Sequence, residues 1–218
     1  MQFRGNRSAN GGPSVTSREQ ILARIRAALP ADDTSQAAIP RTYRHEGQLT
    51  TDERIELLSD RLFDYGCDVH VCKKHEIAQS ITALLKERGK TRLVASADIP
   101  GEWLAGDFGS GGLTYRELDG VEGIVTGCAL AVASTGTIVL RHDASTGSRA
   151  ITLIPDYHLC IVFEEQVVEL VPEAIRGMAA FAPAPMTTIS GPSATSDIEM
   201  TRIQGVHGPR TLDVLIVR

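Results

Sequence analysis

Leu159-Cys-Ile-Val-Phe163 is a continuous apolar run, and Val214-Leu-Ile-Val217 is a second run of the same kind. Both runs are too short for helices and are typical of strands whose two faces are buried in a parallel sheet. Helix-spaced and strand-like apolar residues alternate before them. The helical positions are Ile55, Leu58, Leu62 and Phe63, then Ile77, Ile81, Leu84 and Leu85, and the strand positions are Val69, Val71 and residues 92–96. This alternation predicts an α/β fold with an open, mostly parallel sheet covered by helices.

The first 45 residues differ in composition from the rest of the chain. Residues 1–15 are rich in Gly, Asn and Ser and hold almost no apolar side chains, which predicts a flexible arm. Residues 16–45 are expected to form one amphipathic helix ending at Pro30, followed by a polar linker. Ser17 and Gln20 have the spacing of a capping box at the start of that helix. We therefore expect an N-terminal helical appendage before one α/β domain over residues 46–218.

Charge and hydropathy restrict the classes of partner. Lys and Arg number 22 against 27 Asp and Glu, so the net charge is -5 and no overall positive field attracts nucleic acid. No apolar run approaches the roughly 18 residues that a membrane span needs. The start of the sequence lacks the apolar segment of a secretory signal. We therefore expect a cytoplasmic protein with no nucleic-acid partner and no membrane span.

Cysteine and histidine spacing argues against a metal centre on this chain. Cys67, Cys72, Cys128 and Cys160 form no C-x-x-C pair, and the six histidines form no H-E-x-x-H motif. Each cysteine has apolar neighbours, so a buried apolar role is expected. The glycines of residues 109–112 lack the G-x-G-x-x-G pattern of a dinucleotide site. We expect no metal, iron–sulfur cluster or flavin on this chain.

The first stretch that could carry chemistry runs from Gly123 to Leu140. A strand is expected to end at Thr126-Gly127, an Ala-rich helical connection to follow, and Ser134-Thr-Gly-Thr137 to turn the chain into a second strand. Glycine lets a backbone approach a ligand closely, and hydroxyls beside free N–H groups can bind an anion. A plain turn explains the pattern equally well. The candidate anion-binding residues here are Thr135, Gly136 and Thr137.

The second stretch is Ile189-Ser-Gly-Pro-Ser-Ala-Thr-Ser-Asp-Ile-Glu199. Its hydroxyls and carboxylate surround a Gly-Pro turn, which predicts a loop that opens a short helix capped by Ser196 or Asp197. Loops of this composition can hold phosphates or carboxylates. The candidate anion-binding residues here are Gly191, Ser193, Thr195 and Asp197.

Two further motifs contain histidine. In Gly205-Val-His-Gly-Pro-Arg210, His207 is the candidate for proton transfer, although most lone histidines are structural. Gly208 and Arg210 complete the anion-binding set, because a guanidinium can meet a carboxylate through two hydrogen bonds. In Arg149-Ala-Ile-Thr-Leu-Ile-Pro-Asp-Tyr-His158, the histidine lies at the start of a strand, where a buried structural role is expected.

Open α/β sheets bind ligands in crevices at the ends of strands. Both glycine-hydroxyl turns fall where a buried strand meets a helical sequence. We therefore predict one anion-binding cleft that unites the 135–137 turn, the 193–197 loop, His207 and Arg210.

The motifs Val-Thr-Gly, Ala-Ser-Thr-Gly-Thr-Ile-Val-Leu, Leu-Ile-Pro-Asp-Tyr-His, Ser-Gly-Pro-Ser-Ala-Thr-Ser-Asp-Ile-Glu and Gly-Val-His-Gly-Pro-Arg occur in that order over the C-terminal half. Together they resemble the lactate-utilisation C type of the LUD-domain family, with a looser match back to Thr51. The resemblance implies a fold similar to the NagB/RpiA/CoA-transferase group. It also implies one subunit of a three-protein system that oxidises L-lactate to pyruvate, whose two other subunits are iron–sulfur proteins. Many relatives carry Glu where this chain has Ser134, so a carboxylate base is not available there.

Two other classes of function stay open. A stand-alone enzyme acting on a carboxylate, a CoA thioester or a sugar phosphate fits the two glycine-hydroxyl turns and the fold group. Against it, no nucleophile and base can be paired from the sequence. A small-ligand sensor without chemistry fits as well. Neighbouring reading frames with cysteine cluster motifs would favour the lactate-oxidising assembly over both.

Overall fold

The computed structural model describes residues 16–28, 39–106, 108–109, 112–143, 146–196, 202–205 and 208–218. The chain divides into two units, Met1–Thr42 and Tyr43–Arg218. The first unit contains helix α1 (Ser17–Ala28). The predicted arm over residues 1–15 lies outside the described residues.

The capping box of α1 lies one residue before the predicted one. The Thr16 hydroxyl accepts a hydrogen bond from the Glu19 backbone N–H at 3.3 Å, and the Glu19 carboxylate accepts one from the Thr16 backbone N–H at 2.7 Å. The prediction that Ser17 and Gln20 form this box is therefore wrong. A carboxylate is favoured in the first helical turn because it faces free N–H groups and the positive end of the helix dipole.

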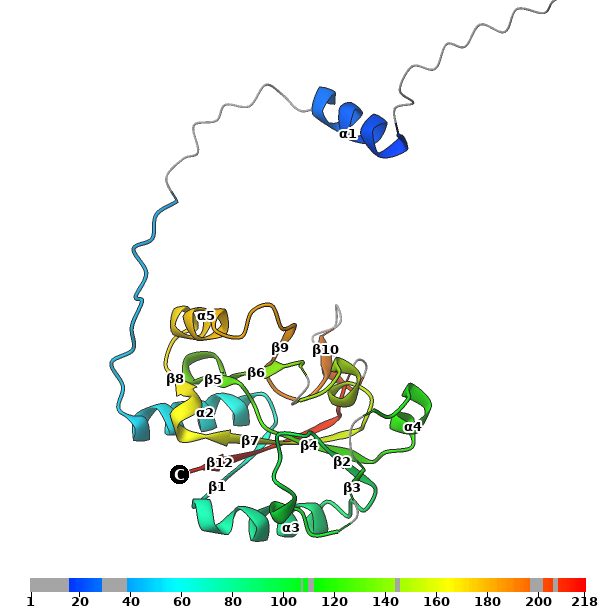
Figure 1. Ribbon diagram of the computed structural model, residues 1–218. Coiled ribbons are helices and arrows are strands. Elements are labelled where there is room, and N and C mark those ends of the chain that lie inside the picture. Colours follow the sequence, from blue (N-terminus) through cyan, green and yellow to red (C-terminus); the bar gives the residue numbers. More distant parts are fainter. Residues whose placement is uncertain are drawn as a thin grey trace, which may run out of the picture. The chain divides into compact units, whose positions relative to one another are not determined.

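A six-stranded sheet forms the centre of the second unit, and every neighbouring pair of strands in it is parallel (Figure 1). In spatial order the strands are β1 (Asp68–Cys72), β12 (Thr211–Val217), β7 (Tyr157–Phe163), β4 (Gly123–Thr126), β2 (Leu93–Ala95) and β3 (Phe108–Gly109). The two apolar runs form neighbouring strands, with Val214 level with Cys160. Both strands are buried along their length, as the sequence predicts.

Helices cover both faces of this sheet. Helix α2 (Thr51–Asp64) packs Leu58 and Leu62 against one face of β7, which presents Cys160 and Val162. Helix α3 (Ile77–Glu87) packs against the opposite face, formed by the alternate residues of β7. The remaining helices are α4 (Tyr115–Asp119), α5 (Val171–Ala179) and the 3-10 turns η1 (Lys74–Glu76), η2 (Gly101–Trp103), η3 (Ala133–Thr135), η4 (Arg149–Thr152) and η5 (Glu164–Gln166).

A second sheet replaces the helical connection predicted after Thr126. Its strands, in spatial order, are β8 (Val167–Val168), β5 (Leu130–Val132), β6 (Thr137–Arg141) and β9 (Met186–Ile189). Leu130 and Val132 of β5 pack toward α5, while Ala131 packs into the core beside α2. The helix prediction is wrong here because both faces of β5 are buried, so its apolar residues do not alternate with polar ones.

Two paired strands lie where a short helix capped by Ser196 or Asp197 is predicted, and Asp197 itself lies outside the described residues. Strand β10 (Ala194–Ser196) pairs antiparallel with β11 (Arg202–Gln204). Ser196 is therefore a strand residue and not a helix cap. Its hydroxyl-rich neighbourhood fits a hairpin because Ser and Thr are accepted in strands and turns as readily as at helix ends.

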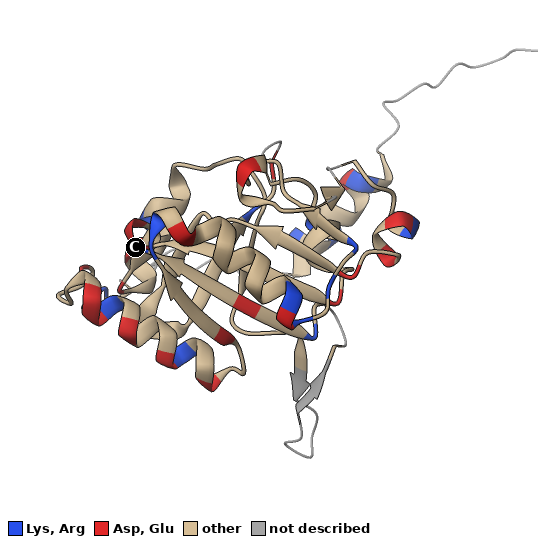
Figure 2. Cartoon of the chain, turned by 90° about the horizontal axis from the view of Figure 1, so that it is seen from below, with Lys and Arg blue, Asp and Glu red and all other residues tan. Residues whose placement is uncertain are grey.

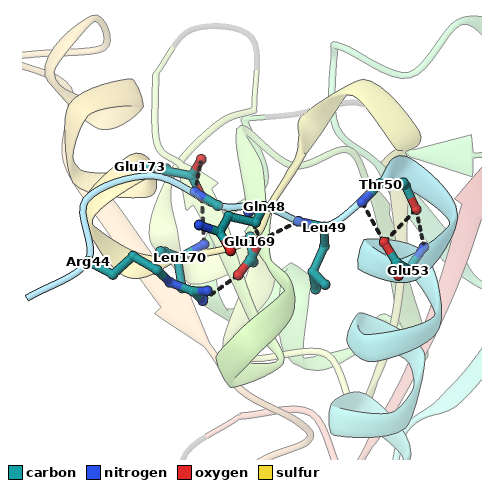
Figure 3. Close-up of polar contacts among 9 residues, drawn as sticks. Arg44, Gln48, Leu49, Thr50, Glu53, Glu169, Leu170 and Glu173 are labelled. Carbon is teal, nitrogen blue, oxygen red and sulfur yellow. Dashed lines mark hydrogen bonds and ion pairs between the residues drawn. The ribbon is translucent and has the colours of Figure 1, made fainter.

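Glu169, at the end of β8, forms hydrogen bonds with the segment before α2 (Figure 3). Its side chain is 4% exposed and accepts hydrogen bonds from the Leu49 backbone N–H at 2.8 Å, from the Gln48 backbone N–H and from the Arg44 guanidinium. The Glu169 carbonyl also accepts the backbone N–H of Ser134 at 3.0 Å. One residue thus joins three segments that are distant in the sequence.

Asp213 is a fully buried carboxylate in β12. It accepts hydrogen bonds from the Arg88 Nε at 2.9 Å and from the Tyr157 hydroxyl at 2.8 Å. Arg88 caps the carboxyl end of α3 and also pairs with Asp68 of β1. A buried charge costs several kcal/mol unless it is paired in this way, so the network ties α3 to the sheet.

Charged residues of both signs occur along the chain. Figure 2 shows basic and acidic residues interspersed along the helices and loops that face the viewer. In the described part of the chain, none of the helices combines the length and the apolar character that crossing a membrane requires.

Candidate functional site

A cavity of about 220 Å³ lies at the amino ends of β7 and β12, and we call it the amino-edge cavity. His158 and Leu212, which are level with each other in these two strands, form its base. Residues 189–194, from the last residue of β9 to the first of β10, line it together with residues 152–153 and 208–209. The cavity therefore lies between the main sheet and the end of the second sheet.

Three of the predicted anion-binding residues line this cavity: Gly191, Ser193 and Gly208. Thr195 lies in β10, and Asp197 and His207 lie outside the described residues. Arg210 is not among the lining residues. Its side chain is 64% exposed, and its Nε lies 3.4 Å from the Asp156 carboxylate. The structure thus brings part of the predicted set together and leaves the predicted guanidinium outside the cavity wall.

The turn formed by Thr135, Gly136 and Thr137 is a neighbour of this cavity but does not line it. The Thr137 hydroxyl lies 2.9 Å from the Ser190 hydroxyl and 2.8 Å from that of Thr135. The two glycine-hydroxyl turns are therefore connected by a short chain of hydrogen bonds. That they bind an anion stays a prediction.

The glycines of both turns face helix α2 and its end. Gly136 has φ +59°, and a Cβ there would lie 2.8 Å from the Arg61 Cβ. Gly191 has φ +88°, and a Cβ there would lie 2.6 Å from the Tyr65 Cβ. Glycine is required at both positions because any side chain would meet both steric overlap and an unfavourable left-handed backbone. This close packing is sufficient to explain both glycines.

His158 supplies a neutral imidazole to the amino-edge cavity. It is 2% exposed, and its Nε2 lies 2.7 Å from the Thr126 hydroxyl. Burial lowers the pKa of His158 to about 4. Because the other described lining residues are apolar, glycine, serine or threonine, the described wall carries no charge at neutral pH. It offers hydroxyl and backbone hydrogen bonds to a ligand.

We expect His158 to make the protein less stable in weak acid. The folded pKa of about 4 lies below the ordinary value of 6.5, so the stabilising contribution is complete above about pH 6.5 and is lost as the pH falls toward 4. The full difference corresponds to about 3 kcal/mol. Urea unfolding between pH 4.5 and 7.5 should show a steeper loss for the native sequence than for His158→Gln. Parallel profiles for the two proteins would contradict this assignment.

A second hollow of about 210 Å³ lies at the opposite ends of the parallel strands, and we call it the carboxyl-edge cleft. Its residues come from the connections after β2, β4, β6, β7 and α5. They are Asp98, Cys128, Ala129, Arg141, Thr146, Gln166 and Phe181. None of these residues belongs to the predicted site.

Hydrogen bonds fix the side chains of this cleft. The Gln166 amide donates to the Cys128 carbonyl at 2.8 Å and accepts the Phe163 backbone N–H at 2.8 Å. The Arg141 Nε lies 2.6 Å from the Asp143 carboxylate, and its guanidinium lies 5.0 Å from the centre of the Phe181 ring. The polar wall is therefore largely preorganised.

The thiol in this cleft is not activated. A hydrogen bond with Cys160 is the largest cause that raises the pKa of Cys128 well above 9, and burial is the second largest. A protonated thiol is a weak nucleophile and a weak metal ligand. Within the described residues, no group of three or more His, Cys, Asp or Glu side chains is placed to hold a metal ion.

Two segments of the sequence outside the predicted site supply residues near this cleft. One is Thr126-Gly-Cys128 at the end of a predicted strand, and the other follows Arg141. That segment begins His-Asp and continues to Thr146-Gly-Ser148, so it is another turn rich in polar side chains and glycine. Its relevance depends on strand order, which the motifs alone do not give.

Comparison with known proteins places these features in one family. The LUD domain model matches residues 110–217. A Deinococcus radiodurans protein named Lactate utilization protein C is 41% identical over 183 residues, which cover 80% of this chain and 84% of that protein. A Macrococcus caseolyticus protein of the same name is 26% identical, with 78% and 80% covered. The crystal structure of a DUF162 family protein from Deinococcus radiodurans superposes with a TM-score of 0.68 at 34% identity and covers 78% of this chain and 100% of that one.

Proposed function

Because the chain belongs to the LUD domain family, we propose that it is a component of a lactate-utilisation system. One observation carries the proposal. The Deinococcus radiodurans relative, which is 41% identical with 84% of its length covered, is named for lactate utilisation. The alignment with this relative covers 80% of this chain.

The finer proposal is that this chain acts with two separate iron–sulfur proteins that receive electrons from L-lactate in the cytoplasm. Converting lactate to pyruvate removes two electrons and two protons, so an electron acceptor is needed. Cys67, Cys72 and Cys160 are buried, and in the described part of the chain no group of three or more His, Cys, Asp or Glu side chains has the placement of a cluster-binding thiolate set. Partner subunits are the proposed source of that chemistry.

The role of this chain in the proposal is to bind a small carboxylate. The amino-edge cavity, with Ser193 and the predicted residues around it, is one candidate place for that ligand. Backbone N–H groups and hydroxyls can hold a carboxylate without a cation, although an ionised donor gives a stronger hydrogen bond.

Deleting the gene should abolish growth on L-lactate as sole carbon source, and restoring the intact gene should recover it. Growth on glucose should be unaffected by the deletion. A tagged copy purified from lactate-grown cells should bring down two proteins that contain iron and sulfide. If the deletion strain grows on lactate as well as the parent strain does, the proposed function is contradicted, whichever proteins the tagged copy binds.

A further inference from the structure

A groove of about 630 Å³ lies between the start of α5 and the segment before α2, and we call it the α5 groove. Residues 43–45, Ser134 and the first two turns of α5 supply its lining. None of its described lining residues belongs to the amino-edge cavity or to the carboxyl-edge cleft. The groove is therefore a separate surface that the proposed carboxylate site does not use.

Large apolar side chains of the α5 groove are exposed. Ile175 is 61% exposed, Tyr43 is 49% exposed and Val171 is 43% exposed. Val171 and Ile175 are four residues apart on α5 and so share one face of the helix. Small-molecule sites enclose most of their ligand, whereas these side chains stand half in solvent. An exposed apolar groove of this kind is typical of a surface that binds a protein segment.

The wall of the groove that faces α5 is held in place by hydrogen bonds. The Gly47 backbone N–H donates to the Glu173 carboxylate at 3.1 Å, and the Arg176 guanidinium donates to the His45 carbonyl at 2.9 Å. Glu169 holds the same segment through Gln48 and Leu49 (Figure 3). A preorganised surface loses little conformational freedom when a partner binds.

The described lining contains two arginines, Arg44 and Arg176, and no Asp or Glu. Glu169 pairs with Arg44, but its side chain is 4% exposed whereas that of Arg44 is 52% exposed, so a partner meets the guanidinium. Glu173 is occupied by two backbone N–H groups. Arg176 pairs with none of the described carboxylates and donates only to a carbonyl. The groove thus presents positive charge beside its apolar side chains.

This charge distinguishes between the candidate occupants. A second copy of the chain, packed through the same groove by twofold symmetry, would bring the arginines of the two copies together. Like charges disfavour such an interface. A segment that carries carboxylates beside apolar side chains complements both parts of the groove.

We propose that the α5 groove binds a partner protein through a segment whose apolar side chains contact Val171 and Ile175 and whose Asp or Glu side chains pair with Arg44 and Arg176. The inference goes beyond the proposed function, because this surface needs no lactate and no small carboxylate. The exposed apolar residues provide the contact area, and the guanidiniums select an acidic segment over a basic one.

Photocrosslinking of the full chain in its own cells identifies the occupant. A benzophenone amino acid in place of Ile175 should form an adduct with a protein, and tandem mass spectrometry of the purified adduct should locate the joined segment. We expect an apolar residue with Asp or Glu within about four positions, the spacing of one helical turn. The control carries the same amino acid in place of Phe63, which is 74% exposed on α2 and lies outside the groove lining, and it should not join that segment.

Charge variants combined with the photocrosslinker test the arginines. Arg176→Glu should lower the yield of the adduct about tenfold, because it sets a carboxylate against an acidic segment. Arg176→Lys keeps the charge and should retain most of the yield. Arg116→Glu reverses the charge of an exposed arginine of α4 and should leave the yield unchanged. Equal yields for Arg176→Glu and Arg116→Glu would overturn the inference.

The identity of the adduct separates this inference from the alternatives. An adduct with a second copy of the chain, with a membrane lipid or with a basic segment would overturn it, and so would the absence of an adduct at position 175. If no adduct forms and the deletion strain cannot grow on lactate, the inference fails while the proposed function stands. If the acidic adduct forms and that strain grows normally on lactate, the proposed function fails while the inference stands.

Discussion

Arg88→Met should lower the free energy of unfolding by about 3–5 kcal/mol, the cost of leaving a buried charge unpaired. Asp213 has no exposure to solvent, and its carboxylate accepts from both the Arg88 guanidinium and the Tyr157 hydroxyl. Removing the guanidinium leaves one hydroxyl to stabilise a full negative charge within the sheet. Urea unfolding followed by circular dichroism gives the measurement.

A control substitution at an exposed arginine and a second substitution that restores stability make this prediction specific. Arg92→Met removes an exposed guanidinium whose partner is 3.9 Å away, and it should change stability by less than about 1 kcal/mol. Adding Asp213→Asn to Arg88→Met removes the unpaired charge, so the double variant should be more stable than Arg88→Met alone. Equal losses for Arg88→Met and Arg92→Met would show that the buried pair contributes nothing beyond a surface contact.

Glu169→Gln should lower the free energy of unfolding by about 2 kcal/mol at neutral pH, because hydrogen bonds to a charged acceptor become neutral ones. The exchange affects the three donors of Leu49, Gln48 and Arg44 together (Figure 3). Chemical unfolding of both proteins measures the loss. Glu165→Gln, at a side chain that is 63% exposed, is the control and should have almost no effect.

The pH dependence of the free energy of unfolding shows whether the Glu169 carboxylate is the source of this stabilisation. Hydrogen bonding to the Leu49 N–H, the largest cause, together with the Gln48 N–H and Arg44, lowers the pKa of Glu169 below 4.5 against a smaller opposing effect of burial. A lowered folded pKa means that this stabilisation is complete above about pH 4.5 and is lost as the pH falls through the folded value. The gap between the native sequence and Glu169→Gln should therefore close in acid. A gap that is constant with pH would assign the loss to packing.

The strands and helices of the main sheet could be predicted from the sequence because each depends on the pattern of neighbouring residues. The runs that become β7 and β12, and the helical spacing at Leu58 and Leu62, depend only on nearby residues. The sequence predicts a helix at β5 because both faces of this strand contact apolar residues, α5 on one side and the core beside α2 on the other, so polar and apolar residues do not alternate. Ala131 and Ala133 added a misleading signal, since alanine favours helices when nothing else decides.

The site was harder to predict because it depends on topology. Gly191, Ser193 and Gly208 meet at the amino-edge cavity because the Ser193 N–H donates to the Pro209 carbonyl at 2.8 Å, which brings the segment before β10 beside the segment before β12. Gly136 carried the same sequence signal, yet its missing side chain makes room for α2. Arg141 and Asp98 share a cleft only because β2 and β4 are neighbours whose connections diverge, a fact that no single segment contains.

The position of β12 between β1 and β7 has a consequence for synthesis on the ribosome. β1 begins at residue 68, but its only neighbour in the described sheet is a strand that begins at residue 211. In a nascent chain that has emerged as far as β7, β1 lacks its neighbour in the described sheet and β7 lacks one of its two. Such long-range closure is slow, and exposed strand edges attract other chains. We therefore expect the emerging polypeptide to depend on chaperones until residue 217 has left the exit tunnel.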